Sequence, residues 1–305
     1  MNQSSGKIPF QKPWRLYAYQ IQLFQQRGLL VSDLPSAEQF LTHLNYYRFS
    51  GYCLAFEVKR HEFVAGTTFE QVVAAYQFDL TLRDLLTEAL EVVEVDIRAA
   101  VAYLFGRRHG AFGHTDATNF FIPRFDHREW LDRLHYEAKR SSELFVTHFK
   151  NTYTEFPDLP VWIATEVMSF GGLSKMVAGM HKRDQKEIAL RYGLQPNILR
   201  SWMHHLVYIR NLCAHHSRLW DRVWEIKPEL PAGKNWQPPA ILGNNRLFST
   251  LLLLRHWMKF IPAIHFFASQ WQTRVADHLG CPPSTSNAFG RMGLTADWHR
   301  HPVWL

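Results

Sequence analysis

Apolar residues recur at intervals of three and four positions over most of the chain, which is the period of an amphipathic helix. Few runs alternate β-branched and polar residues, so the sequence predicts an all-α fold. The longest periodic segment begins after Thr68, a predicted N-cap, and is expected to end at Gly106. Its apolar positions include Val72, Tyr76, Leu80, Leu85, Leu86, Val93, Ile97 and Val101. We expect this helix to be the spine of the molecule.

Helix start and stop signals predict several further helices. They are an opening helix from Pro13 to about Gln26, a second one capped by Ser36, a third capped by Asp126, one from Pro160 that Gly171 and Gly172 interrupt, and one from Pro196 that runs past Arg210.

The most apolar stretch, Leu247 to Phe267, is interrupted by charged residues and by Pro262. A membrane span needs about 20 almost uncharged residues, so we expect a buried helix here and no membrane association. The proline-rich segment from Lys227 to Gly243 is expected to be a loop. We therefore predict one elaborated all-α domain, with an N-terminal helical part (13–125), a core (126–267) and a C-terminal tail (268–305).

Composition narrows the environment and the partner. Hydrophobic residues make up 47% of the 305 residues, enough for a sizeable core. Three widely spaced cysteines do not form a disulfide framework, which together with the lack of a signal-peptide core predicts a cytoplasmic protein. The net charge of +7 favours a polyanionic partner. No P-loop and no G-x-S-x-G elbow is present, which excludes those two nucleotide-binding and hydrolase signatures.

The densest cluster of functional residue types is YIRNLCAHHSRLWDR, from Tyr208 to Arg222. If the helix continues through it, one polar and basic stripe forms, with Arg210 about 100° away. The stripe contains Asn211, His215, Arg218 and Arg222. Such a set is suited to RNA cleavage without a metal, because an imidazole transfers protons near neutral pH and guanidiniums stabilise charge on phosphate oxygens. The alternative is a solvated face in which the arginines pair with Asp221 and Glu225.

A resemblance favours the catalytic interpretation. Arg210, a polar residue, three further residues and His215 are similar to the signature of the HEPN ribonucleases. Four blocks occur in the order found in the Abi family of abortive-infection proteins, the AbiD and AbiF type, and the resemblance extends from about Pro13 to Phe267. The blocks are LNYYRFSGY (44–52), EVDIRAAVAYLFGRRHGAFGH (94–114), LPVWIATEVMSFGGLSKM (159–176) and RNLCAHHSRLWDR (210–222).

The resemblance implies a HEPN-type helical bundle with elaborating helices, usually a dimer in which two Arg-His motifs meet. It implies a metal-independent endoribonuclease without cofactors, which leaves a 2′,3′-cyclic phosphate and a 5′-hydroxyl. It also implies a toxin-like effector of phage defence, controlled by a small RNA encoded nearby. Arg210 and His215 would be catalytic and Asn211 supporting. His216 adjoins His215, so a spacing of five intervening residues is the second choice.

Other residues are candidates for supporting roles. Glu166 lies in an otherwise apolar helix expected in the core, where it would pair with Arg210; an ordinary, partly exposed glutamate is the alternative. The aromatic block from Tyr46 to Tyr52 around Arg48 suits stacking on single-stranded RNA, although burial of the rings is also expected. Cations in or beside the glycine-containing loop from Arg107 to Pro123 are candidates to bind phosphates. They are Arg107, Arg108, His109 and His114.

Two rival functions stay open at the level of sequence. One is a catalytically inactive helical module that holds a small structured RNA. The other is a protein-interaction partner whose Arg-His helix only stabilises a dimer. The sequence does not specify the target RNA, the trigger or the inhibitor.

Overall fold

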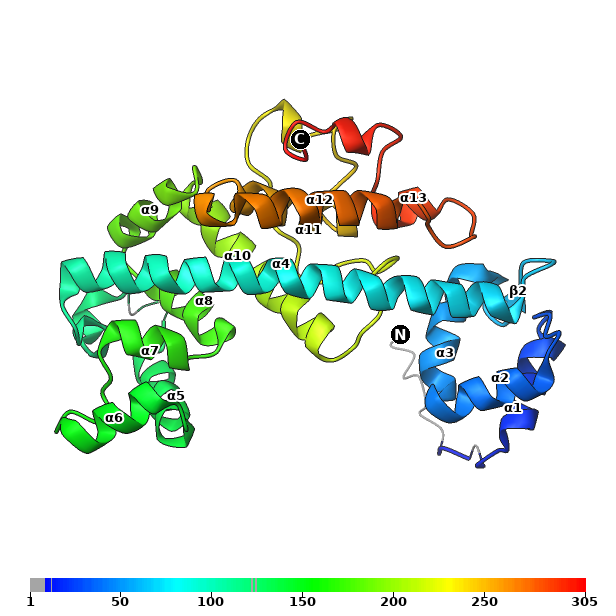
Figure 1. Cartoon of the computed structure of the whole chain (residues 1–305), viewed down its shortest axis with the longest axis horizontal. Coiled ribbons are helices and arrows are strands. Elements are labelled where there is room, and N and C mark those ends of the chain that lie inside the picture. The colour runs from blue at the N-terminus through cyan, green and yellow to red at the C-terminus, as the bar shows by residue number, and fades with distance from the viewer. Residues whose placement is uncertain (1–8, 12, 122, 124) are drawn as a thin grey trace, which may run out of the picture. The chain divides into compact units, whose positions relative to one another are not determined.

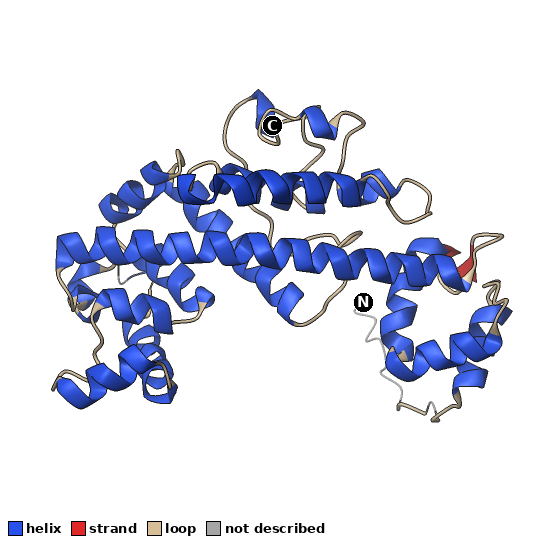
Figure 2. Cartoon of the chain, viewed as in Figure 1, coloured by secondary structure: helices blue, strands red, loops and turns tan. Residues whose placement is uncertain are grey.

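The computed structural model describes residues 9–11, 13–121, 123 and 125–305, so Ile122 of the predicted loop lies outside the described residues. Within these ranges it contains thirteen α-helices, several single 3-10 turns and one two-stranded hairpin, which confirms the predicted all-α class (Figure 2). The chain forms two compact units whose boundary lies inside one long helix, between Gln77 and Phe78. This division into compact units does not test whether the chain folds as one domain, so the single domain stays a prediction.

The first unit contains the described residues up to Gln77 together with Pro283–Ser286. Its core is aromatic: the Phe49 ring stacks on Phe69 at 4.8 Å and meets the edge of Phe24 at 5.3 Å. Its elements are α1 (Tyr17–Gln26), α2 (Leu34–His43), α3 (Tyr46–Cys53), a 3-10 turn (Leu54–Phe56), the antiparallel pair β1 (Glu57–Lys59) and β2 (Glu62–Phe63), and the start of α4 (Phe69–His109).

The second unit contains the remaining part of α4 and the later helices, and its core includes the fully buried Trp202, Trp257 and Trp271. Its further α-helices are α5 (His127–Arg140), α6 (Leu144–Thr152), α7 (Val161–Val167), α8 (Phe170–Gly179), α9 (Lys182–Arg191), α10 (Pro196–Ala214), α11 (Leu247–Met258), α12 (His265–Leu279) and α13 (Ala288–Met292). Its 3-10 turns are Gly113–Thr115, Ala117–Asn119, Lys234–Trp236, Pro262–Ile264 and Trp298–Arg300.

Helix α4 is the predicted spine, and Figure 1 shows it as one continuous element. Its N-cap is confirmed: the Gln71 N–H donates to Thr68 Oγ1 at 3.3 Å, and the Thr68 N–H donates to Gln71 Oε1 at 3.0 Å. The predicted end at Gly106 is wrong, because the helix continues to His109. A Cβ on Gly106 would lie 3.1 Å from Val161 Cγ1, so this glycine allows α7 to approach α4 closely.

Three other predicted helix boundaries are also corrected. The opening helix begins at Tyr17 and not at Pro13. Asp33, not Ser36, caps α2, since its carboxylate accepts the Ser36 N–H at 3.0 Å. Gly171 and Gly172 do not interrupt a helix: α7 ends at Val167, and both glycines lie in the first turn of α8, where Ser169 caps the Gly172 N–H. Asp126 and Pro196 begin α5 and α10 as predicted.

The C-terminal part of the chain is packed into the second unit. The predicted helix from Leu247 to Phe267 is two helices, because the chain turns at Pro262 between α11 and α12. The segment predicted as a tail contributes buried tryptophans, and the Trp271 Nε1–H donates to the Leu85 carbonyl of α4 at 2.7 Å. No single described helix is long and apolar enough to cross a membrane; the bent pair 247–258 and 262–279, at 110°, meets that criterion only in combination.

The second unit buries four of its described histidines, and two of them, His114 and His205, have strongly lowered pKa values. His205 joins α10 to its surroundings through the Ile226 carbonyl at 2.6 Å and Thr250 Oγ1 at 2.9 Å. His114 is fully buried, and neither of its ring nitrogens has a hydrogen-bond partner. Burial lowers the pKa of each ring to about 4, because it penalises the charged form.

These depressed pKa values predict a loss of stability in acid. Each histidine takes up a proton in the unfolded chain near pH 6.5 but resists it when folded, so stability falls as pH drops from about 6.5 to about 4. For His114 the expected loss between pH 7 and pH 5 is about 2 kcal/mol. Urea unfolding of wild type and His114→Leu at both pH values checks this, since carboxylate titration is common to both proteins. An equal acid-induced loss in the two proteins would contradict the assignment.

Candidate active site

The Arg-His motif lies at the C-terminal end of α10. This helix begins with Pro196 at its first position and buries one face of apolar side chains together with His205. Arg210 and Asn211 lie on the opposite side and are exposed. No carboxylate lies within 4.0 Å of the Arg210 guanidinium among the described residues, so its charge is available to a ligand.

The helix ends in a Schellman motif formed by the two histidines and the next residue. Ala214 is the last helical residue, and the His216 N–H donates to the Cys213 carbonyl at 2.9 Å. The Ser217 N–H donates to the Leu212 carbonyl, also at 2.9 Å. His216 has a φ of +53°, the left-handed conformation that this motif normally assigns to glycine. A bulky residue in a strained conformation at a helix end often marks a functional position.

A buried ion pair on α4 holds the chain just after the motif. The Asp79 carboxylate accepts the backbone N–H groups of Leu219 at 3.0 Å and Trp220 at 2.8 Å. It also pairs with Arg83 at 2.8 Å, and Arg83 donates to the Ser217 carbonyl at 3.3 Å. Both charged side chains are almost completely buried. Three polar contacts, two made by Asp79 and one by Arg83, therefore fix the segment after α10 to α4.

An open groove of about 710 Å³ runs between α4 and the end of α10. Arg210, Cys213 and His216 line it from α10, and Glu166 lines it from α7. His215 is exposed but is not among the lining residues. Burial raises the pKa of the Cys213 thiol to about 12, so this cysteine is not a nucleophile at neutral pH.

The α4 side of the groove carries carboxylates. Asp84, Glu91 and Glu94 line it from this helix. Arg98 is paired with Glu94 and donates to the Met168 carbonyl at 2.7 Å, so its charge is already used inside the protein. Arg83 is likewise held by Asp79. Among the described residues, the groove thus offers one guanidinium without a carboxylate partner, that of Arg210, opposite a wall that carries three carboxylates and two paired arginines.

The predicted helical stripe is wrong beyond His215, because α10 ends before it. Arg218 and Arg222 lie in the following non-helical segment, where Arg218 pairs with Asp221 at 3.1 Å and Arg222 with Glu225 at 3.8 Å. These are the carboxylates named in the alternative interpretation. The structure brings Arg210, Asn211, His215 and His216 to one helix end and leaves both later arginines outside this group.

Glu166 is also placed differently from the core position expected for it. Its side chain is exposed, and it shares the groove with Arg210 without a pairing distance under 4.0 Å among the described residues. The helix that carries it buries its other face, through Val161, Ala164 and Thr165.

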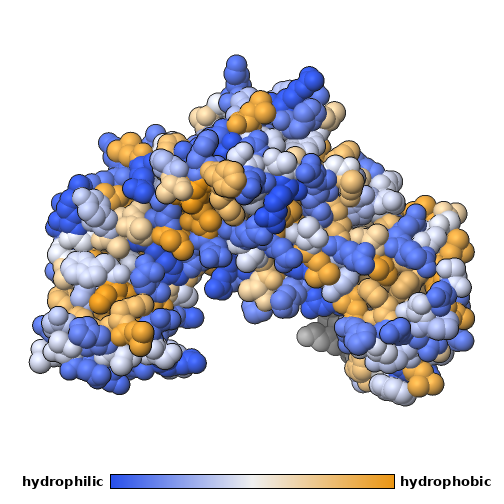
Figure 3. All heavy atoms as spheres, viewed as in Figure 1, coloured by the Kyte–Doolittle hydropathy of each residue, from blue (hydrophilic) through white to orange (hydrophobic). Residues whose placement is uncertain are grey.

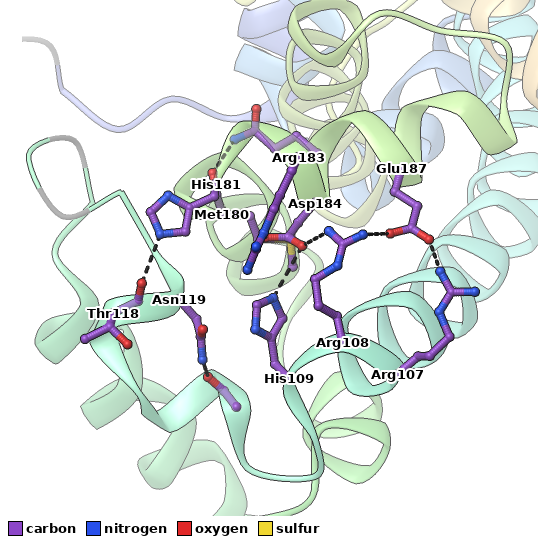
Figure 4. A network of polar contacts seen from close by, with 12 residues as sticks. Arg107, Arg108, His109, Thr118, Asn119, Met180, His181, Arg183, Asp184 and Glu187 are labelled. Carbon is purple, nitrogen blue, oxygen red and sulfur yellow. Dashed lines mark hydrogen bonds and ion pairs between the residues drawn. The ribbon is translucent and has the colours of Figure 1, made fainter.

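The proposed phosphate-binding cations beside the loop are mostly paired inside the protein (Figure 4). Arg107 and Arg108 form ion pairs with Glu187 of α9, and Arg108 also pairs with the buried Asp184. His109 lies 3.3 Å from the same Asp184 carboxylate. His114 is fully buried, which excludes a direct RNA contact in this conformation. The cluster fastens the end of α4 to α9.

The aromatic block around Arg48 is partly buried. Phe49 and Tyr52 belong to the core of the first unit, as the burial alternative expects. Tyr47 is 66% exposed, and Arg48 is also exposed. An RNA-binding role for Arg48 stays a prediction.

The sequence analysis missed Asp79 and Arg83, which hold the segment after the motif, and Arg98, which binds carbonyls at the break between α7 and α8. A signal was present, since Asp79 and Arg83 are spaced by four on a helix that otherwise presents apolar residues to the core. Among the described residues, no group of three or more His, Cys, Asp or Glu side chains is arranged to hold a metal ion.

The fold and the site define a helical protein that presents Arg, Asn and two His side chains at the exposed end of one helix. The family model described as Abi-like protein matches residues 39–221, more than half of the chain. The chain therefore belongs to the Abi-like family, which confirms that part of the resemblance. No curated protein and no solved structure matches the chain. Membership of the HEPN superfamily and of the AbiD and AbiF type stays a prediction.

The anchoring role of Asp79 predicts a large effect of a small substitution. Asp79→Asn removes the negative charge that pairs with the buried Arg83, and we expect it to reduce the free energy of unfolding by about 3 to 5 kcal/mol. The matched control is Glu88→Gln, which removes the exposed Glu88–Arg274 pair and is expected to cost less than about 1 kcal/mol. Urea denaturation of the three proteins checks this; equal midpoints for both variants would contradict it.

Proposed function

We propose that this Abi-like protein is a metal-independent endoribonuclease of the HEPN type and an effector of abortive infection. The observation that carries the proposal is the exposed helix end on which Arg210, Asn211, His215 and His216 meet. These residues are not needed to bury the core, and the Arg210 guanidinium is not neutralised by a carboxylate of the described chain. The family match supports the abortive-infection part.

The chemistry is an internal transesterification. One imidazole takes the proton from a ribose 2′-hydroxyl, whose oxygen attacks the adjacent phosphorus, and the bond to the 5′-oxygen breaks. A protonated imidazole returns a proton to that leaving oxygen. Arg210 stabilises the charge on the non-bridging oxygens, and Asn211 orients an imidazole or the phosphate. The products are a 2′,3′-cyclic phosphate and a 5′-hydroxyl.

Two imidazoles are required, and the chain offers two ways to supply them. In a homodimer, each copy contributes one Arg-His motif to a shared site. Within one chain, His215 and His216 are adjacent. We favour the dimer with His215 as the main catalytic histidine, although His216 shares the groove with Arg210.

The proposal includes a cytoplasmic location, single-stranded RNA as substrate and a small neighbouring RNA as regulator. The alternative is a non-catalytic protein that holds a small structured RNA. The carboxylates on the α4 wall of the groove disfavour tight RNA binding at that wall. None of them in the described chain pairs with Arg210, so a purely structural role for Arg210 is not favoured either.

The first test is cleavage of a labelled single-stranded RNA in EDTA, with product ends analysed. We expect wild type to leave cyclic phosphates, and Arg210→Ala or His215→Ala to lower the rate at least 100-fold while RNA affinity changes little. His216→Gly is a matched variant, since glycine accepts the left-handed conformation and removes only the imidazole. If it alone abolishes cleavage, His216 replaces His215 as the catalytic residue. Wild-type protein that binds RNA but never cuts it, after removal of any co-purified RNA, would leave the non-catalytic alternative.

A second test concerns assembly. If two motifs complete the site, the specific activity should rise with protein concentration through the range in which sedimentation shows a dimer forming. A monomer that retains full activity at every concentration would refute the composite site without refuting the nuclease.

A further inference from the structure

A second groove, separate from the Arg-His site, lies entirely within the first unit and has a volume of about 790 Å³. It is formed by the segment before α1, by α1 itself, and by the turn between α2 and α3. Five of its lining side chains are tryptophan or tyrosine: Trp14, Tyr17, Tyr19, Tyr46 and Tyr47. Trp14 is 82% exposed and Tyr47 is 66% exposed, and Phe10, which also lines the groove, is 78% exposed, so several large rings are presented to solvent.

The groove is basic as well as aromatic. Arg15, Arg27 and His43 line it, and none of its lining residues in the described chain is Asp or Glu. The Arg15 guanidinium lies 4.5 Å from the centre of the Tyr19 ring. Arg27 donates to the Tyr46 hydroxyl at 3.1 Å. Arg15 thus lies over a ring and Arg27 beside a tyrosine hydroxyl, and no carboxylate of the described residues lies within 4.0 Å of either guanidinium.

The walls of this groove are held in place by contacts within the first unit. The Tyr46 ring stacks on the buried Phe24 of α1 at 4.9 Å, and the Gln20 side chain donates to the Arg15 carbonyl at 2.9 Å. The Tyr46 ring and the backbone at Arg15 are therefore in place before any ligand arrives, which lowers the entropy cost of binding. Figure 3 shows hydrophobic patches between hydrophilic residues on the face that it draws. Tyr and Trp side chains combine an apolar ring with a polar group, so they suit a binding surface that is in contact with water.

We propose that this groove binds single-stranded RNA, with bases stacked on Trp14 and Tyr47 and phosphates held by Arg15 and Arg27. Stacking on exposed rings along a basic track is the way in which proteins hold unpaired nucleic acid without reading its sequence. The choice of RNA over DNA rests on the proposed ribonuclease function. This aromatic groove binds the substrate RNA, whereas the carboxylates on the wall beside Arg210 disfavour RNA binding there.

A proline-rich peptide is the other class of ligand that aromatic grooves accept. The charge of this groove favours RNA. Three basic side chains and no carboxylate complement a chain of phosphates, and a polyproline segment offers no negative charge for them to meet.

The test measures affinity for a labelled, mixed-sequence, single-stranded RNA with 2′-O-methyl groups, which lacks the hydroxyl needed for cleavage. Trp14→Ala and Tyr47→Ala are each expected to weaken binding by roughly 5- to 150-fold. Trp14→Phe should keep most of the affinity, and Arg15→Gln should lower the salt dependence. A duplex of the same sequence should bind more weakly than the single strand.

The controls are Phe266→Ala and Tyr136→Ala, which remove exposed rings from the second unit and should leave affinity unchanged. Circular dichroism and thermal melting establish that each variant is folded. Wild-type affinity in a folded Trp14→Ala, Tyr47→Ala double variant overturns the proposal, as does a wild-type protein that binds no single-stranded RNA or binds a proline-rich peptide instead. Loss of binding in these variants, with no cleavage of ordinary RNA by wild type, upholds the groove and rejects the nuclease.

Discussion

The Asp79–Arg83 pair is the constraint on which the candidate site depends. Burying a carboxylate away from solvent costs free energy unless its oxygens accept hydrogen bonds or pair with a cation. Here the Asp79 carboxylate accepts two backbone N–H groups and pairs with one guanidinium. The backbone groups belong to the segment that leaves α10. The same contacts that make the buried charge tolerable thus fix where the Arg-His helix ends, and they tie the exposed motif to the most extensive helix of the chain.

A second buried guanidinium works in a similar way nearby. Arg98 meets carbonyls at the break between α7 and α8, where a helix end leaves acceptors without partners. Gly106 allows the start of α7 to lie against α4. Both features bring α7, and with it Glu166, to the side of the groove that contains Arg210. Hydrogen bonds and close packing at helix ends therefore shape the groove.

The sequence predicted the parts of the fold that follow from local rules. Period and caps identified the all-α class, the start of α4 at Thr68, the Asp126 cap and the start of α10 at Pro196. Boundaries set by tertiary contact were missed: Gly106 accommodates a neighbouring helix, and α10 ends at Ala214, before the segment that Asp79 holds through Leu219 and Trp220. The motif could be located because its residue types are unusual together. The pairing of Arg107 and Arg108 depends on α9, and no spacing along the chain reveals those partners. Arg218 and Arg222 pair with Asp221 and Glu225, three positions further along, and these partners could be named from the sequence.

The left-handed conformation of His216 has a consequence for how such motifs are compared. Along a printed sequence, His215 and His216 differ by one position, and the two spacings look interchangeable. In space, His216 adopts the left-handed conformation and lines the groove, whereas His215 is not among the lining residues. Two chains that share the spacing between the arginine and the histidine, but in which a different residue adopts the left-handed conformation, would present different histidines to a substrate. The sequence motif alone therefore does not say which of the two histidines is presented to a substrate, whereas the backbone conformation of this turn does.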